Sequence, residues 1–325
     1  LSKYQNLRSS LRDEAGHDLA KDSNLFRTNV SSDNDPVWLP LEGADPTLEQ
    51  VIFYERLKPE VQGLIDCLYD DDQKKLKLSE GFRGITSVGA AALLATTANE
   101  EDPFWSQIYK AIESARGGEE VKVFIISSIF GGTGAAGFPN IARRIKRIQE
   151  EKKVTSNFHL GGALMLPYFN YQVPDENMEH EIFAKPEEFL DQTKGALDYY
   201  AKLFEHDKIF DQVYVTGWDP LSKLPNFKMG GNLQNNPPLF PELYAALGAL
   251  KFFSEDNKIN DMQEIFHIGK NESDEILWSD IPNVSSNLNS KENISKLIRF
   301  VFCYNWIYGP ALTGSWSKIK KYQNE

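Results

Sequence analysis

The sequence predicts an α/β protein with a mostly parallel sheet flanked by helices, and two adjacent stretches lead to this fold class. The run Val121–Phe130 is short, almost continuously apolar and rich in β-branched residues, which is typical of a fully buried strand. The segment after it carries Ile141, Ile145 and Ile148 at spacings of four and three, so we expect a helix with one apolar face, over Asn140–Lys153.

The connection between this strand and this helix predicts a phosphate-binding loop. It contains only small side chains: Gly131, Gly132, Thr133, Gly134, Ala135, Ala136 and Gly137. Bare backbone N–H groups admit phosphate oxygens, and the dipole of the following helix favours negative charge. Thr133 adds a hydroxyl donor. The alternative is a tight strand-to-helix connection that binds no ligand.

Two common phosphate motifs fit this loop incompletely. Gly132-x-Gly134-x-x-Gly137 satisfies the dinucleotide fingerprint, but that fingerprint also needs an acidic residue at the end of the next strand, and the segment His159–Tyr168 ends without one. A Walker A loop needs Lys-Ser or Lys-Thr after its glycines, and neither is present.

Phe130–Ala136 resembles the Gly-Gly-Gly-Thr-Gly-Ser/Thr-Gly signature of the tubulin and FtsZ superfamily, in a divergent bacterial form. The resemblance implies a Rossmann-related domain that binds GTP or GDP with Mg²⁺ and assembles head to tail into filaments. Gly131–Ala136 would then hold the α- and β-phosphates. An acid from the adjacent subunit would orient water if GTP is hydrolysed.

Upstream of this loop the sequence predicts several short helices. Residues 1–35 are polar, with one helix expected over Ser2–Lys21, and they contain neither the strand nor the first glycine loop that the resemblance implies. Further helices are expected over Thr47–Glu55 and Glu60–Tyr69, and Asp70–Asp72 is expected to be a solvated loop.

A second glycine loop, containing Gly81 and Gly84, precedes an apolar helix, for which Ser87 is the predicted N-cap. This stretch resembles the γ-phosphate loop of the superfamily, so the resemblance implies phosphate contacts for Gly84 and Thr86. Arg83 faces the phosphates in one interpretation and is a surface arginine in the other. Asp102-Pro103 starts the next helix as N-cap and first helical residue.

Downstream, the resemblance implies a ribose and base site. The strand Phe158–Leu166 leads to Tyr171, where the superfamily has a ribose-binding glutamate; Glu176 or Glu179 are the substitutes. A helix over Glu187–Glu205 and a strand over Asp211–Thr216 follow. Trp218 then stacks on a purine while Asp219 accepts its hydrogen bonds, or the pair is a packed tryptophan and a turn.

The apolar segment Leu239–Phe253 predicts a buried central helix. The resemblance makes the amides before it, Asn235 and Asn236, candidates for base recognition. The predicted nucleotide-binding domain is therefore 1–254. Residues 255–325 form a C-terminal segment with Asp256 and Asp261, a helix over Asn293–Tyr308 and a basic end at Lys318–Lys321.

The composition restricts the partners. The net charge of −12 argues against general nucleic-acid binding, and no segment is apolar over the length needed to span a bilayer. Cys67 and Cys303 lack metal-like spacing and are expected to be buried free thiols in the reducing cytoplasm.

Three functions follow in order of preference. The first is a tubulin-like GTP-binding protein that self-associates and hydrolyses GTP between subunits. The second is a tubulin-like interaction protein without turnover, favoured by Phe130 in place of the first signature glycine and by the unmatched catalytic acids. The third is a dinucleotide-binding oxidoreductase.

Overall fold

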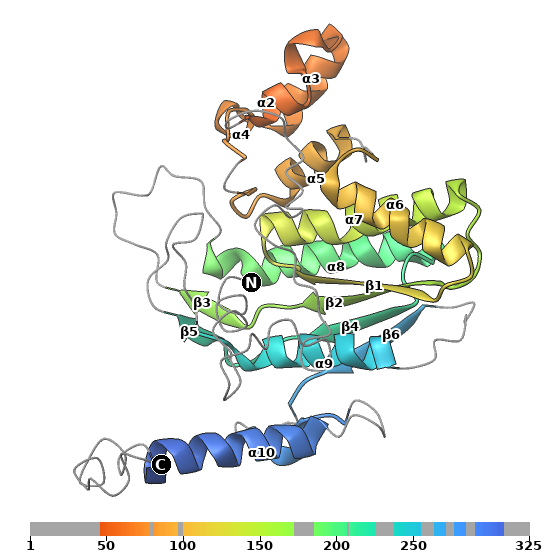
Figure 1. Cartoon of the computed structure of the whole chain (residues 1–325). Helices are drawn as coiled ribbons and strands as arrows, with labels where there is room; N and C mark the ends of the chain where they lie inside the picture. Colours follow the sequence, from red (N-terminus) through yellow and green to blue (C-terminus); the bar gives the residue numbers. More distant parts are fainter. Residues whose placement is uncertain are drawn as a thin grey trace, which may run out of the picture. The chain divides into compact units, whose positions relative to one another are not determined.

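The structure is a computed structural model, shown in Figure 1, that describes residues 46–78, 81–96, 100–171, 185–206, 208–224, 237–254, 263–270, 276–283 and 290–308. The chain divides into two compact units. One consists of Leu1–Leu39 with Ala98–Ala111, and the other of Pro40–Thr97 with Ile112–Glu325. The predicted boundary after residue 254 stays a prediction.

The larger unit contains a parallel sheet, which confirms the predicted α/β class. Its strand order is β1-β2-β4-β6, and every neighbouring pair is parallel: β1 (Val121–Ser128), β2 (Phe158–Met165), β4 (Gln212–Thr216) and β6 (Glu264–Ile268). A separate two-stranded parallel sheet joins β3 (Phe169–Tyr171) to β5 (Ser222–Leu224). The sequence interpretation missed β3, β5 and β6, which have only three to five residues each.

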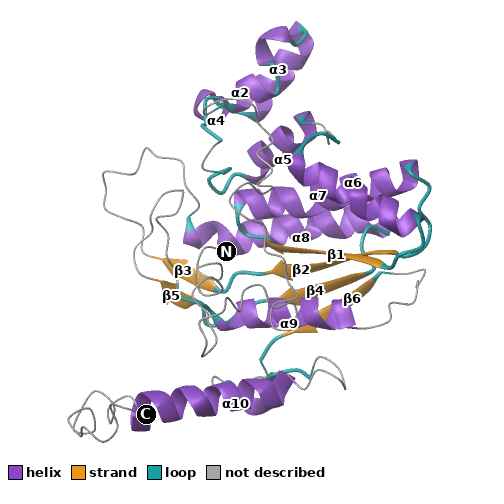
Figure 2. Ribbon diagram, viewed as in Figure 1, coloured by secondary structure: helices purple, strands orange, loops and turns teal. Residues whose placement is uncertain are grey.

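Helices cover both faces of the main sheet (Figure 2). Two adjacent glycines of β2 show how closely these helices pack on the sheet. A Cβ on Gly162 would lie 2.7 Å from the ring of Phe138 in α7 (Gly132–Glu151), whereas a Cβ on Gly161 would lie 2.8 Å from Phe252 in α9 (Phe240–Ser254). Because successive residues of a strand point to opposite faces, α7 and α9 lie on opposite sides of β2.

Strand β1 is less buried than predicted. None of its residues is fully buried, and Ile126 is exposed. The reason is its position, since β1 pairs only with β2 among the described strands and so forms an edge of the described sheet. An apolar, β-branched run does not by itself distinguish a central strand from an edge strand.

Helix α7 begins at Gly132, eight residues before the predicted start at Asn140. The predicted glycine loop is therefore mostly the first two turns of the helix. Pro139 lies inside α7 and has no N–H to donate to the carbonyl of Ala135, four residues earlier. The Tyr200 hydroxyl of α8 (Phe189–His206) donates to that carbonyl instead, at 2.5 Å.

The segment from Pro46 to Ala95 forms short helices: α2 (Leu48–Val51), η2 (Tyr54–Arg56), α3 (Pro59–Leu68), α4 (Asp71–Lys74) and α5 (Thr86–Ala95). The continuous helix predicted over Thr47–Glu55 is wrong, because Phe53 has a left-handed φ of 52° that interrupts it. The loop predicted at Asp70–Asp72 is also wrong. The Asp70 carboxylate accepts the Gln73 N–H at 2.8 Å and caps α4.

In the smaller unit, the described residues 100–111 begin α6 (Pro103–Arg116). Asp102 caps it as predicted, since its Oδ1 accepts the N–H groups of Phe104 at 2.8 Å and Trp105 at 3.3 Å. Trp105 is fully buried, and its ring meets Phe104 edge to face.

The later helices lie close to their predicted positions: α8, α9 and α10 (Ser290–Cys303), the last continued by a π-helical turn, Tyr304–Tyr308. The two cysteines differ from the prediction that both are buried, since Cys67 is an exposed thiol and Cys303 is half-buried. Leu190 and Leu197 of α8 are exposed. No helix in the described ranges combines the length and the apolar character needed to cross a bilayer.

Several predicted features lie outside the described residues: the helix Ser2–Lys21, the carboxylates Glu176, Glu179, Asp256 and Asp261, the amides Asn235 and Asn236, and the basic end Lys318–Lys321.

Candidate functional site

The first turn of α7 presents backbone N–H groups at the carboxyl end of β1. The chain leaves β1 through buried Ile129, whose N–H donates to the Met165 carbonyl at 3.0 Å. Gly131 is the N-cap, with φ −108° and ψ 150°, and no side chain caps the helix. The first N–H groups of a helix have no partner within it, and the 20-residue helix adds its dipole. This end of α7 is therefore suited to an anion.

Two glycines of the first turn are also required by packing. A Cβ on Gly134 would lie 2.3 Å from the carbonyl oxygen of Ser128, and a Cβ on Gly132 would lie 2.9 Å from the backbone of Gly84. Gly137 has no such constraint, since its Cβ would meet nothing closer than Ile141 at 3.6 Å. The glycine pattern is thus explained partly by close packing of α7 on β1 and on the second glycine loop.

The second glycine loop lies directly on the first turn of α7. Three of its residues have left-handed φ values: 83° at Gly81, 41° at Arg83 and 88° at Gly84. The Phe82 N–H donates to Thr133 Oγ1 at 3.3 Å. The hydroxyl expected to contact phosphate therefore also fastens the two loops together.

The structure brings the beginnings of two helices together at this point. Helix α5 starts at Thr86 with Ile85 as its N-cap, and the N-cap prediction for Ser87 is wrong. Like α7, α5 has no side-chain cap. The Ile85 backbone nitrogen is 2.8 Å from where a Cβ on Gly132 would lie. Gly84 and the start of α5 are thus placed beside Gly132. The shared phosphate site that the resemblance implies for Gly84, Thr86 and Gly131–Ala136 stays a prediction.

Small residues also allow α5 and α7 to pack closely. A Cβ on Gly89 would lie 2.8 Å from the Cβ of Ala136 and 2.5 Å from the Phe82 ring. Ala136 and Ala135 are both buried. The side chain of Ala136 therefore serves helix packing, so contact of this residue with a ligand would have to come from its backbone.

Phe130, the departure from the glycine signature, belongs to an aromatic cluster. Its buried ring is 4.9 Å from Phe189, 5.4 Å from Phe169 and 5.8 Å from Tyr168, between ring centroids. Tyr171, at the position of the expected ribose glutamate, lies 6.0 Å from Phe189. Burial raises the pKa of Tyr171 to about 12, with Glu187 adding to the effect, so this phenol is neutral at ordinary pH.

Trp218 packs against protein at the start of α9. Its ring centroid is 5.6 Å from Phe240 and 6.4 Å from Tyr244, and Lys270 Nζ lies 5.2 Å from the ring. These contacts favour the packed-tryptophan interpretation, although the side chain is only half-buried. Asp219 is exposed, and Asn236 lies outside the described residues.

Sequence reasoning missed Glu242 as a candidate base-binding group. It lies in the first turn of α9, where its Oε1 accepts the Tyr168 hydroxyl at 3.4 Å and its Oε2 accepts the Leu239 N–H at 3.3 Å. Tyr168 follows β2, so this exposed carboxylate is tied to the carboxyl end of the sheet. The sequence feature that could have identified Glu242 is an acidic residue in the first turn of an otherwise apolar helix.

Within the described ranges, no three His, Cys, Asp or Glu side chains gather into a metal site.

These features define an α/β protein with an uncapped helix N-terminus and a second glycine loop at the carboxyl edge of a parallel sheet. Residues 68–184 match a protein-family model described as "Tubulin like". This part of the chain is tubulin-like. No match was found among curated proteins or among solved structures.

Proposed function

We propose that this tubulin-like chain binds a guanine nucleotide between its two glycine loops. The observation that carries the proposal is the first turn of α7, which has no side-chain cap and lies against the backbone of Gly84. In this proposal the N–H groups of Gly131–Gly134 bind the α- and β-phosphates, because the Ala135 N–H already donates to the Gly131 carbonyl at 2.9 Å. Gly84 with Thr86 contacts the γ-phosphate.

The sites for the guanine base and for the metal ion are assigned by their position in the fold. Glu242 would accept hydrogen bonds from the N1 and exocyclic amine of guanine, with Trp218 forming one wall of the base site. Asn236 stays a candidate from the sequence alone. Mg²⁺ would neutralise the β- and γ-phosphate oxygens, and the Thr133 hydroxyl would be one side-chain oxygen beside it.

Self-association is the second part of the proposal. Hydrolysis would need an acid supplied by an adjacent copy, because a turnover site of this kind is completed between subunits. A cytoplasmic location also belongs to the proposal. Cys67 is an exposed free thiol, and such thiols persist in reducing compartments.

One observation favours a second candidate, an interaction protein that has lost turnover. The aromatic cluster around Phe130 and the neutral phenol of Tyr171 occupy positions where the resemblance implies a glycine and a ribose-binding carboxylate. A protein with this arrangement would bind nucleotide weakly or not at all and act through its surfaces.

Mass spectrometry of small molecules released from the purified protein tests these alternatives, followed by calorimetric titration with GTP, GDP, ATP and NAD in the presence of Mg²⁺. Recovered GTP or GDP, or saturable uptake of either, supports the proposal. Recovered NAD overturns it in favour of an oxidoreductase. If the purified protein contains no nucleotide and binds none of these four ligands, the result favours the interaction protein without turnover.

A further inference from the structure

Helix α3 carries an apolar stripe that faces solvent. Val61, Leu64 and Leu68 recur at spacings of three and four, so they lie on one side of the helix. Their side chains are 41%, 58% and 60% exposed, and no residue of α3 is buried. An amphipathic helix normally buries such a stripe. Here it is uncovered within a single copy.

The surroundings of this stripe are acidic. Residues 59–72 contain five acids and no lysine or arginine: Glu60, Asp66, Asp70, Asp71 and Asp72. Lys58, the N-cap of α3, and Lys75 flank this segment, and Lys74 pairs with Asp66 at 2.7 Å and with Asp71 at 2.9 Å. Residues 58–75 therefore carry five acids against three lysines and stay negative. The surface around α3 therefore combines apolar side chains with a negative field.

Helix α10 carries a second uncovered stripe. Ile294, near its start, packs against Leu247 and Ile281. Farther along the same side, Leu297, Ile298 and Val301 are 60%, 53% and 45% exposed. The exposed apolar surface continues into the π-helical turn with Tyr304 and Trp306.

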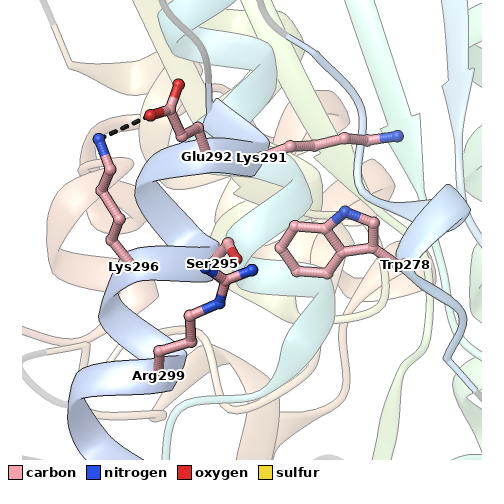
Figure 3. Close-up of a pocket in the computed structure, with 6 residues that line it drawn as sticks. All are labelled: Trp278, Lys291, Glu292, Ser295, Lys296 and Arg299. Carbon is pink, nitrogen blue, oxygen red and sulfur yellow. Dashed lines mark ion pairs between the residues drawn. The ribbon is translucent and has the colours of Figure 1, made fainter.

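Positive charge accompanies the α10 stripe. Over Ser290–Tyr308 the chain has Lys291, Lys296 and Arg299 against the single acid Glu292. These side chains, with Ser295 and Trp278, line an open pocket of about 250 Å³ on the flank of the helix (Figure 3). Lys296 pairs with Glu292 at 2.7 Å, so Lys291 and Arg299 give the pocket its net positive charge.

We propose that α10 of one copy packs antiparallel against α3 of a second copy. Both stripes are exposed in one copy, so neither covers the other there. They are similar in length, since Val61–Leu68 and Ile294–Val301 each cover eight residues of helix, or about 11 Å. The antiparallel direction sets Lys291 and Lys296, in the first half of α10, beside the acids at the carboxyl end of α3, and it opposes the two helix dipoles.

The partner follows from charge and symmetry. An anionic membrane would attract α10, but it would repel a chain whose net charge is −12. The α3 surface of a second copy instead offers α10 both apolar side chains and negative charge. Because α3 and α10 are different surfaces, the contact is heterologous. After one contact, one copy still has a vacant α3 surface and the other a vacant α10 surface, so the contact propagates from copy to copy. The inference rests on the self-association in the proposed function, but not on nucleotide binding.

Complementation between two blocked variants tests this contact. Leu64→Asp/Leu68→Asp blocks the α3 surface, and Leu297→Asp/Val301→Asp blocks the α10 surface.

In sedimentation velocity, with and without GTP and Mg²⁺, we expect wild type to form larger species as its concentration rises. Each variant alone should lose at least tenfold in association constant. Their equimolar mixture should form one-to-one dimers and nothing larger. Leu190→Asp, at an exposed position of α8, is the matched control and should behave as wild type.

Several outcomes would overturn the proposal. A wild type that stays monomeric at every concentration rules it out, as does a mixture that does not associate. Dimers of the α3-blocked variant alone would indicate pairing of α10 with itself. Binding to phosphatidylserine vesicles that is lost in the α10-blocked variant, without self-association, would indicate a lipid partner.

Two controls keep these outcomes interpretable. Circular dichroism confirms that each variant is folded. If the aspartate variants fail to fold, Lys296→Glu/Arg299→Glu replaces them, since both side chains are exposed. Its association should fall at least tenfold at low salt and less at high salt. Calorimetric titration with GTP on the same samples should match wild type, which separates failure of this contact from failure of nucleotide binding.

Discussion

A Cβ on Gly132 would lie 2.9 Å from both the backbone nitrogen and the carbonyl carbon of Gly84. The first turn of α7 and the second glycine loop are therefore in backbone contact. This contact makes the candidate phosphate site one unit, because a change in either loop is transmitted to the other.

Gly132→Ala should destabilise the protein by about 1–3 kcal/mol, since backbone atoms of the Gly84 loop cannot move aside as a flexible side chain can. Urea denaturation measures this effect. Gly137→Ala is the matched control in the same helix. Its new methyl group meets nothing closer than 3.6 Å, so it should gain about 0.5–1 kcal/mol from helix propensity. Equal effects of the two substitutions would contradict the packing described for Gly132.

Thr133→Val should cost about 1–3 kcal/mol, because it removes the acceptor of the Phe82 N–H and leaves that half-buried group without its bond. Thr133→Ser keeps the hydroxyl and should cost less. The comparison is made by thermal and urea unfolding. A valine variant as stable as the serine variant would show that the 3.3 Å hydrogen bond does not hold the loops together.

Phe130→Ala should cost about 3–5 kcal/mol, as expected for removal of a buried aromatic side chain. Its ring packs on Phe189 and Phe169, so the loss should also loosen the start of α8. Hydrogen exchange of α8 measures the second effect. Unchanged protection there would mean that the cluster does not connect α8 to the end of β1.

Stability should decline at alkaline pH through buried tyrosines. Burial raises the pKa of Tyr244 to about 12 from 10.0, and its hydroxyl donates to the Asp280 carbonyl at 3.0 Å. The folded protein thus holds this proton more tightly than the unfolded chain does. Its contribution is complete below pH 10 and is lost as the pH rises toward 12. Tyr244→Phe should reduce the slope of unfolding free energy against pH in this range. An unchanged slope would contradict the assignment.

Local signals in the sequence predict several elements of the fold well. The strand β1, the helix after it, the Asp102 cap of α6 and the apolar helix α9 each depend on neighbours within a few residues. The start of α7 was placed too late because Pro139 and the run of small residues Gly131–Gly137 suggest a loop. What permits helix there is the Tyr200 hydroxyl, which comes from α8, 65 residues from Ala135 along the chain.

The rest depends on contacts that are distant in sequence. Ile126 is exposed because β1 is an edge strand of the described sheet, and a single strand sequence does not carry that information. The contact of Gly132 with Gly84 and the bond of Glu242 to Tyr168 join segments 48 and 74 residues apart. Sequence patterns predicted the two glycine loops, but only the structure shows that they touch.

The most direct test of the central claim is calorimetric titration of GTP, with Mg²⁺, into wild type, Gly131→Asp and Gly131→Asn. Residue 131 has extended N-cap geometry, and a Cβ there would meet nothing closer than Ser128 Oγ at 3.4 Å. Either side chain should cap α7 and raise stability by a few tenths of a kcal/mol, about what separates these caps from glycine. Only aspartate places a negative charge where the phosphates would bind. We expect Gly131→Asp to weaken GTP binding at least a hundredfold, well beyond the effect of Gly131→Asn, while thermal stability is kept or improved. Equal GTP affinity in wild type and a folded Gly131→Asp variant would contradict phosphate binding at the start of α7.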